Sequence, residues 1–164
     1  MKDSIDIALQ HLVGLTFWDL GRAAEMRKFA FGAERQNPRR PTSRVGEWEL
    51  HVQGAWRLRR GGVVAVGSRD VFDVVDAARG RWDEPMNNVC DIRCREVFSG
   101  ASPLVTRASV AANGALSIRC ADGLVLETWT DSWAGEQWYL FRPGESGVGL
   151  YFEVVRGIGR FGEE

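Results

Sequence analysis

Apolar and polar residues alternate along several short segments of the chain, and such alternation predicts β-strands with one buried face. The clearest case is the segment 48–53, where Trp, Leu and Val alternate with Glu, His and Gln. Trp56 and Leu58 continue the same parity beyond Gly54. The pattern predicts a half-buried strand and places His51 on its exposed face, as a half-solvated surface histidine.

A glycine-bearing turn follows this strand at residues 60–62, whose sequence is Arg-Gly-Gly. A three-residue loop sets Leu58 opposite Val64 and Trp56 opposite Val66, whereas a two-residue loop would break this match of apolar side chains. The pattern therefore predicts the longer loop.

Two further loops, at 112–114 and 121–123, each contain a glycine and obey the same rule. At the second loop, a two-residue turn would set Ile118 opposite Glu127, so a three-residue loop is expected there too. The expected pairs are Val110 with Leu116, Ala108 with Ile118, Cys120 with Leu124 and Ile118 with Leu126. Residues 105–130 are thus predicted to form a three-stranded meander. Its expected buried face consists of Ala108, Val110, Leu116, Ile118, Cys120, Leu124 and Leu126.

Helical periodicity predicts two short helices. Ser4 is suited to cap the first, and Gly14 is suited to end it. The shared apolar face of this helix consists of Ile5, Ala8, Leu9 and Leu12. A second helix is expected within 89–98, where Cys90, Cys94 and Val97 fall on one side and Arg93 and Arg95 on the exposed side.

The remaining β-type segments pair along the chain. Residues 15–20 and 26–31 predict an early hairpin with its turn at 21–25. Residues 138–141 and 150–155 predict a last hairpin around a Pro-Gly turn, and the sheet is expected to end there.

Two segments lack apolar periodicity and predict loops. Residues 36–44 contain Pro38, Pro41 and a cluster of arginines, and residues 68–88 are rich in aspartate. The chain is therefore expected to be one α+β domain, residues 1–164, mainly β. It would hold an antiparallel sheet of hairpins and a meander, with one or two short helices. A sandwich and a curved sheet both fit, and closure into a barrel is left open.

Composition and charge limit the kinds of partner and the cell compartment that we expect for this protein. The 21 basic and 22 acidic side chains give a net charge of −1, which provides no strong field toward nucleic acid. No apolar run is long enough to cross a bilayer, and the N-terminus lacks the basic start of a signal peptide. The odd set of Cys90, Cys94 and Cys120 suggests reduced thiols. We expect a cytoplasmic protein without nucleic-acid or membrane partners.

No catalytic or cofactor motif stands out. The chain has no nucleophile elbow and no Walker loop, and the glycines at 157, 159 and 162 are followed by no helix that would receive a phosphate. The Cys90-x-x-x-Cys94 spacing is weak for zinc, and buried thiols explain it better. We expect no catalytic residue, no cofactor and no metal.

Partner-binding candidates gather in a segment rich in tryptophan and acidic residues. They are Trp129, Asp131, Trp133 and Glu136, and Arg57 and Arg59 of the central hairpin join them. Exposed tryptophans would anchor an interface, whereas buried ones would form a second core layer. Both alternatives remain open for Trp129 and Trp133.

The order of residues from 116 to 141 resembles a known kind of protein. It reads Leu-x-Ile, Asp-Gly, Leu-x-Leu-Glu-x-Trp, then Asp131 and Glu-x-Trp-x-Leu-Phe, with further likeness at 47–58 and 66–70. Families of small bacterial proteins that resemble immunity proteins share this order. The resemblance implies a non-enzymatic protein that neutralises a bacterial toxin by masking its surface, and it brings no catalytic residues.

The alternative function is a small hydrolase or ligand-binding protein. Its cleft would collect carboxylates from the loop 70–84 and from Asp131 and Glu136. A deep cleft with adjacent carboxylates favours this alternative, whereas a flat exposed face with aromatic residues favours the binding protein. The oligomeric state and the identity of the partner are left open.

Overall fold

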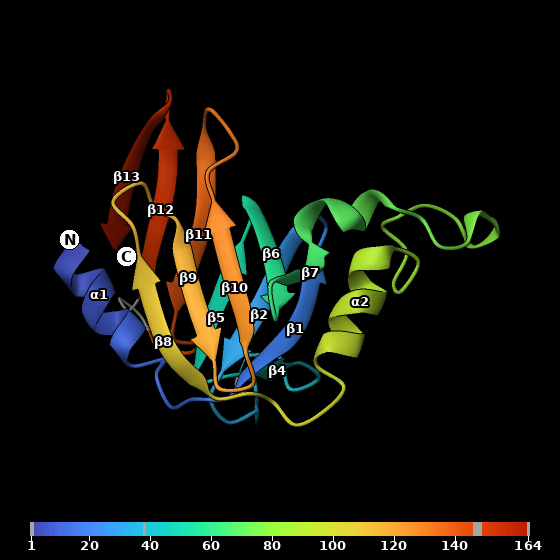
Figure 1. Ribbon diagram of the computed structural model, residues 1–164, viewed down its shortest axis with the longest axis horizontal. Coiled ribbons are helices and arrows are strands. Elements are labelled where there is room, and N and C mark those ends of the chain that lie inside the picture. Colours follow the sequence, from blue (N-terminus) through green and yellow to red (C-terminus); the bar gives the residue numbers. More distant parts are fainter. Residues whose placement is uncertain (1, 38, 146–148, 164) are drawn as a thin grey trace.

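A computed structural model describes residues 2–37, 39–145 and 149–163, and most of its strands form two antiparallel sheets (Figure 1). In order across the six-stranded sheet lie β1 (Phe17–Ala23), β2 (Met26–Phe31), β5 (Trp48–Val52), β11 (Gly135–Phe141), β12 (Gly149–Val155) and β13 (Ile158–Glu163). In order across the five-stranded sheet lie β7 (Val63–Gly67), β6 (Ala55–Arg60), β10 (Leu124–Trp129), β9 (Leu116–Cys120) and β8 (Val105–Val110). The predicted α+β class with mainly antiparallel strands is confirmed, and neither sheet closes into a barrel within the described residues.

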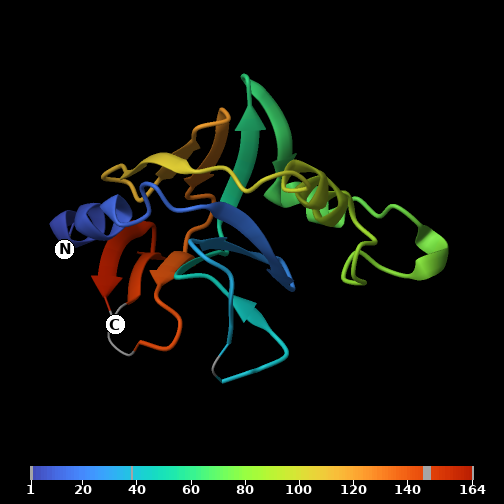
Figure 2. The ribbon, with the colours of Figure 1, turned by 90° about the horizontal axis from the view of Figure 1, so that it is seen from below.

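The other elements lie at the sides of the two sheets. They are α1 (Lys2–Gln10), β3 (Arg35–Gln36), β4 (Arg44–Val45), the 3-10 helices η1 (Ser68–Phe72) and η2 (Ala77–Arg79), and α2 (Val89–Val97). Residues 73–86 extend away from the sheets beside α2 (Figure 2). No helix in the described part of the chain is long and apolar enough to span a membrane.

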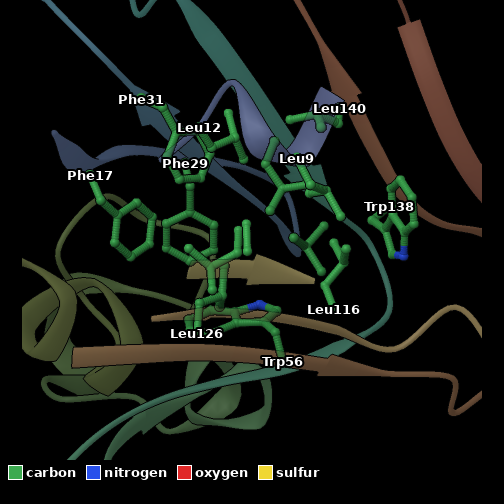
Figure 3. Close-up of a cluster of buried hydrophobic side chains, with 14 of the residues drawn as sticks. Leu9, Leu12, Phe17, Phe29, Phe31, Trp56, Leu116, Leu126, Trp138 and Leu140 are labelled. Atoms are coloured by element: carbon green, nitrogen blue, oxygen red, sulfur yellow. The ribbon is translucent and has the colours of Figure 1, made fainter. Parts of the chain in front are cut away.

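The inner faces of the two sheets share one hydrophobic core (Figure 3). Phe29 of β2 meets Trp56 of β6 edge to face, with ring centroids 5.4 Å apart, and so joins the sheets. Trp138 is also buried, and its indole Nε1 donates to the Gly114 carbonyl at 2.7 Å. Aromatic side chains of this size contribute much of the area that a core removes from water.

The predicted meander is confirmed in register. Ala108 pairs with Ile118, Val110 with Leu116, and Ile118 with Leu126. All seven residues expected on its inner face are buried. Because side chains alternate strictly between faces, this register also fixes which residues point outward.

The prediction of a three-residue loop at 60–62 is wrong, because Arg60 pairs with Val63 and the turn has two residues. Gly61 and Gly62 have φ angles of 57° and 84°, as a two-residue hairpin turn requires, and Leu58 pairs with Val66 rather than Val64. Ala65 is the extra residue in a bulge, and this bulge restores the apolar match that the tight turn alone would lose. Two consecutive glycines can adopt the positive φ angles of the two-residue turn, and the bulge corrects the one-residue shift in register that this turn causes.

Both helices exist, with corrections at the first. Its predicted apolar residues are buried, but the helix begins at Lys2, so Ser4 lies inside it and does not cap it. The helix also ends at Gln10, so Leu12 and the predicted end at Gly14 lie in the turn that follows. In α2, Cys90 and Cys94 are buried, Val97 is half-buried, and Arg93 and Arg95 are exposed, as predicted.

Both predicted hairpins are present, but the first has a shorter turn than predicted and the last is followed by a further strand. The first hairpin pairs β1 with β2, but its turn is only Ala24 and Glu25. The last hairpin pairs β11 with β12 as expected, yet the sheet continues to β13, where Phe161 faces Phe152. The glycine-rich sequence of 157–162 concealed this strand, because glycine carries little strand propensity.

The two predicted loops are mainly irregular. The first contains a two-residue strand pair in which Arg35 faces Val45 and Gln36 faces Arg44, and Pro38 lies outside the described residues. The second contains the short 3-10 helices η1 and η2. Its base is tied to the body by two buried asparagines, Asn87 and Asn88.

Candidate functional site

The outer face of the five-stranded sheet brings three of the predicted residues together. Arg57 donates through Nε to Glu127 Oε2 at 2.8 Å, and Arg59 Nη2 lies 3.0 Å from Glu127 Oε1. The Arg57 guanidinium also lies over the Trp129 ring, 5.4 Å from its centroid. These side chains point outward because the residues that alternate with them, Leu58 on β6 and Leu126 and Thr128 on β10, are buried.

Two arginines that the sequence reasoning did not select extend this face. Arg107 of β8 and Arg119 of β9 are directly opposed across the strands, and both are exposed. Within the described residues neither forms an ion pair. Like charges directly opposite each other destabilise a sheet. The pair therefore lowers the stability of the fold, and folding gives no reason for its presence.

We call these residues together the arginine face: Arg57, Arg59, Arg107, Arg119, Glu127 and Trp129. Four arginines stand against one carboxylate, an excess of three positive charges on a chain with a net charge of −1. Val125 lies between Arg59 and Arg119 in register and is buried although it faces outward. The aliphatic stems of flanking arginines provide such cover while their guanidinium groups stay in water.

The ion pairs of this face shift two pKa values. Hydrogen bonds from Arg59 and then Arg57 hold the pKa of the Glu127 carboxyl below its ordinary range. The same carboxylate raises the pKa of Arg59. Glu127 therefore remains charged and orders two of the four arginines.

Trp129 also borders a hollow of about 520 Å³ on this side of the sheet. Ser109, Ser117 and the aliphatic part of Arg57 line it as well. The side chain of Trp129 is 41% exposed, so it belongs to the surface and not to a second core layer. An exposed tryptophan beside arginines has the composition that is enriched in protein interfaces.

The other three candidates lie elsewhere. Trp133 is 69% exposed, and its ring lies beside Gly157 at the β12–β13 turn, whose amide donates to the Trp133 carbonyl. Asp131 is exposed in the same loop. Glu136 accepts a hydrogen bond from Gln53 Nε2 at 2.9 Å. Trp133 and Glu136 thus contact residues of the six-stranded sheet and not the arginine face.

A second group of arginines and carboxylates is buried between β1, β2 and α2. Arg27 donates to Asp19 through Nε at 2.8 Å and to Asp91 through Nη1 at 2.9 Å. Arg22 donates through Nε to both oxygens of Asp91, at 3.1 and 3.0 Å. We call these four residues the arginine–aspartate cluster, and it lines a cleft of about 640 Å³.

The cluster is satisfied internally. Arg22 also donates to the carbonyls of Ala24, Trp82 and Asp83, and so ties the extended segment 73–86 to the body. Burial by itself would raise the pKa of Asp91, but hydrogen bonds and charge from Arg22, with further bonds from Asn88 and Arg27, hold it below its ordinary range. Asp91 is thus held as a carboxylate and lacks the raised pKa of a general acid.

The carboxylates predicted to gather in a cleft have separate local tasks. Asp70 accepts from the Gly67 amide at 2.8 Å, and Asp76 accepts from the Ala78 amide at 2.9 Å. Both cap short 3-10 helices. Asp83 of this loop does line the cleft of the arginine–aspartate cluster, but the other carboxylates there, Asp19 and Asp91, come from outside the loop.

The cysteines occupy core positions. All three are buried and free. Burial raises the pKa of the Cys120 thiol to about 12. Across the described ranges, no group of three or more His, Cys, Asp or Glu side chains is placed to hold a metal ion.

Comparisons with protein-family models, with curated proteins and with solved structures gave no match to this chain. The resemblance to immunity proteins therefore stays a prediction, and any function rests on the surfaces described above.

The sequence contained a signal for part of what was missed. In the meander, Arg107 and Arg119 alternate with the residues expected on its buried face, such as Ala108 and Ile118, and so belong to its outer face. The same parity argument would therefore have added them to the face of Arg57. By contrast, Arg22 and Asp91 are 69 positions apart, and no local pattern joins them.

Proposed function

We propose that this chain is a non-enzymatic protein-binding module of the immunity type, and that its arginine face binds an acidic surface of a partner protein. The observation that carries the proposal is the pair Arg107 and Arg119, which oppose each other across β8 and β9 and form no ion pair within the described residues. An acidic partner would supply the missing negative charge and speed association.

The composition of the face supports a protein partner over a nucleic acid. Single-stranded nucleic acids stack successive bases on several aromatic side chains, whereas Trp129 is the aromatic residue of this face. Glu127, at its centre, would repel phosphates but can accept hydrogen bonds from a protein. A flat sheet with one aromatic anchor and arginines around it fits a protein interface.

The satisfied arginine–aspartate cluster supports a binding protein over a hydrolase. Hydrolysis by two carboxylates needs one of them protonated near neutral pH. Asp91 instead accepts hydrogen bonds from Arg22 and Arg27, which help to hold its pKa below its ordinary range.

The test is co-expression of the tagged chain with the products of the reading frames that flank its gene. We expect one product to form a stoichiometric complex and to lose its toxicity in that complex. The double variant Arg107→Glu/Arg119→Glu should weaken the complex by about tenfold or more, because two attractive contacts become repulsive.

The matched control is Arg160→Glu, an exposed arginine on β13 of the other sheet, which should leave the complex unchanged. A complex that survives the double variant with equal affinity contradicts the proposed face. Tighter binding of single-stranded DNA than of any protein would contradict the proposed partner class.

A further inference from the structure

The outer face of the six-stranded sheet carries a cleft of about 570 Å³ beneath the segment 37–45. Lys28 of β2, Glu49 and His51 of β5, and Phe141 of β11 form its floor. Small-molecule sites in proteins have volumes of roughly 300–1,000 Å³. The cleft is on the sheet opposite to the arginine face and separate from it.

A histidine–carboxylate pair lies in this floor. His51 Nε2 is 3.1 Å from Glu49 Oε2, and the imidazole meets the Phe141 ring edge to face at 4.9 Å between centroids. A carboxylate can only accept, so the shared hydrogen belongs on Nε2, and in the neutral imidazole Nδ1 is then an acceptor. The expected surface histidine is therefore an oriented group, and Glu49, expected on the exposed face, is only 5% exposed.

Glu49 has an unused oxygen. Its Oε1 is buried and has no hydrogen-bond partner within the described residues. An unsatisfied buried carboxylate oxygen costs free energy, and native structures rarely keep one without a purpose. Together with Nδ1 of His51, it makes the floor a place that accepts hydrogen bonds from a donor.

Cations line the same cleft. Lys28 is the register neighbour of His51, and Arg39, Arg40 and Arg44 contribute from the segment above. Glu49 is the one carboxylate of this lining within the described residues, although Arg44 also pairs with Glu34 outside the cleft. Four cations exceed what a single carboxylate ligand needs and suit the two charges of a phosphate monoester.

We propose that this cleft binds a small phosphate monoester that carries a free hydroxyl group. The phosphate lies against Lys28 and the arginines of the covering segment. The hydroxyl donates to the Glu49–His51 pair, which satisfies the acceptor that the folded chain leaves open. The proposal adds a ligand to the protein and does not depend on the protein partner.

The experiment is isothermal titration of the full chain with glycerol 3-phosphate, with inorganic phosphate and glycerol as comparison ligands. We expect saturable binding of glycerol 3-phosphate with a dissociation constant of about 1 mM or lower, and weaker binding of the other two. Lys28→Gln and Arg40→Gln should each weaken it about tenfold. In ¹⁵N NMR spectra, the imidazole signals of His51 should shift on binding.

The matched controls are His11→Asn, the other histidine of the chain, and Arg160→Gln, and both should bind as the unchanged protein does. Lys28 is half-buried, so Arg40→Gln in the exposed segment keeps the test valid if Lys28→Gln does not fold. Absence of saturable binding, or equal binding by Arg40→Gln, overturns the phosphate site. Equal affinity for inorganic phosphate and glycerol 3-phosphate, with unmoved His51 signals, overturns the role of the Glu49–His51 pair.

Discussion

The arginine face and the arginine–aspartate cluster use the same side-chain chemistry in opposite ways. In the cluster, two arginines meet two aspartates, and Arg27 is only 2% exposed. On the face, four arginines meet one carboxylate, and Arg107 and Arg119 remain in water with no ion-pair partner among the described residues.

The difference follows from the cost of removing a charge from water. A buried guanidinium must be paired and hydrogen-bonded, or the fold does not tolerate it. An exposed one keeps its hydration, so an excess of positive charge costs little there. Matched charge in the interior is therefore structural, whereas unmatched charge at the surface is available to a partner. The predictions below challenge that division, from the largest expected effect to the smallest.

Asp91→Ala should cause the largest loss of stability. It leaves Arg22 and Arg27 buried without their shared carboxylate, and breaking a buried ion pair from one side costs about 3–5 kcal/mol. The free energy of unfolding, measured by urea titration, checks this. Glu96→Ala, which removes the exposed partner of Arg93 on α2, should cost less than about 1 kcal/mol. Equal losses in the two variants would contradict the structural role of the cluster.

Acid should weaken the same cluster. The folded chain holds the pKa of Asp91 below its ordinary value, so the unfolded chain binds the proton more readily. The carboxylate thus stabilises the fold above about pH 3.9, and this contribution disappears as the pH falls below that value through the lower folded pKa. Urea titrations across this range should show the stability difference between the unchanged protein and Asp91→Asn shrinking with falling pH. A constant difference would contradict this account.

Glu127→Gln should change binding more than folding. It removes two solvent-exposed ion pairs, worth less than about 1 kcal/mol, and raises the positive charge of the arginine face. Binding of a poly-glutamate peptide at low salt should tighten, and added salt should cancel the gain. Glu136→Gln, which removes a carboxylate outside this face, is the control and should bind the peptide as before. Weaker binding by Glu127→Gln would show that ordering of Arg57 and Arg59 matters more than net charge.

The smallest effect concerns the cysteines. Burial raises the pKa of the Cys120 thiol to about 12, so its reactive thiolate is scarce at pH 8. A hydrogen bond with Cys94 lowers the pKa of the Cys90 thiol, but burial keeps all three thiols from the reagent. Iodoacetamide should leave the native protein unlabelled over a period in which it labels the urea-unfolded chain fully. Mass spectrometry counts the labels. Rapid labelling of the native state would place a thiol at the surface.

The predictions from sequence succeeded where one local rule governed the outcome. Alternation across the loop 112–114 gave the register of Val110 and Leu116, and it separated the inner face from the outer one. The rule failed at 60–62, because a bulge at Ala65 compensated a turn that alternation alone would reject. Its last failure was Glu49, which parity placed outside but which the segment 37–45 covers.

The candidate sites divide in the same way. Arg57, Arg59 and Trp129 were selected from sequence, and the structure gathers them with Glu127. Trp133 was selected with them, but it lies in the loop after β10 and contacts Gly157 of the other sheet's β12–β13 turn. Distance along the chain is a poor guide there, since consecutive strands β10 and β11 belong to different sheets.

The sequence by itself determined the class of the fold, the meander and the inner and outer sides of its strands, because side-chain alternation is a property of each strand alone. Only the tertiary structure decided that most strands divide between two sheets, that Arg22 and Asp91 meet, and that Arg107 and Arg119 stand directly opposite each other. Those contacts join segments distant in the chain. Their energies depend on burial and on neighbours that no local pattern specifies.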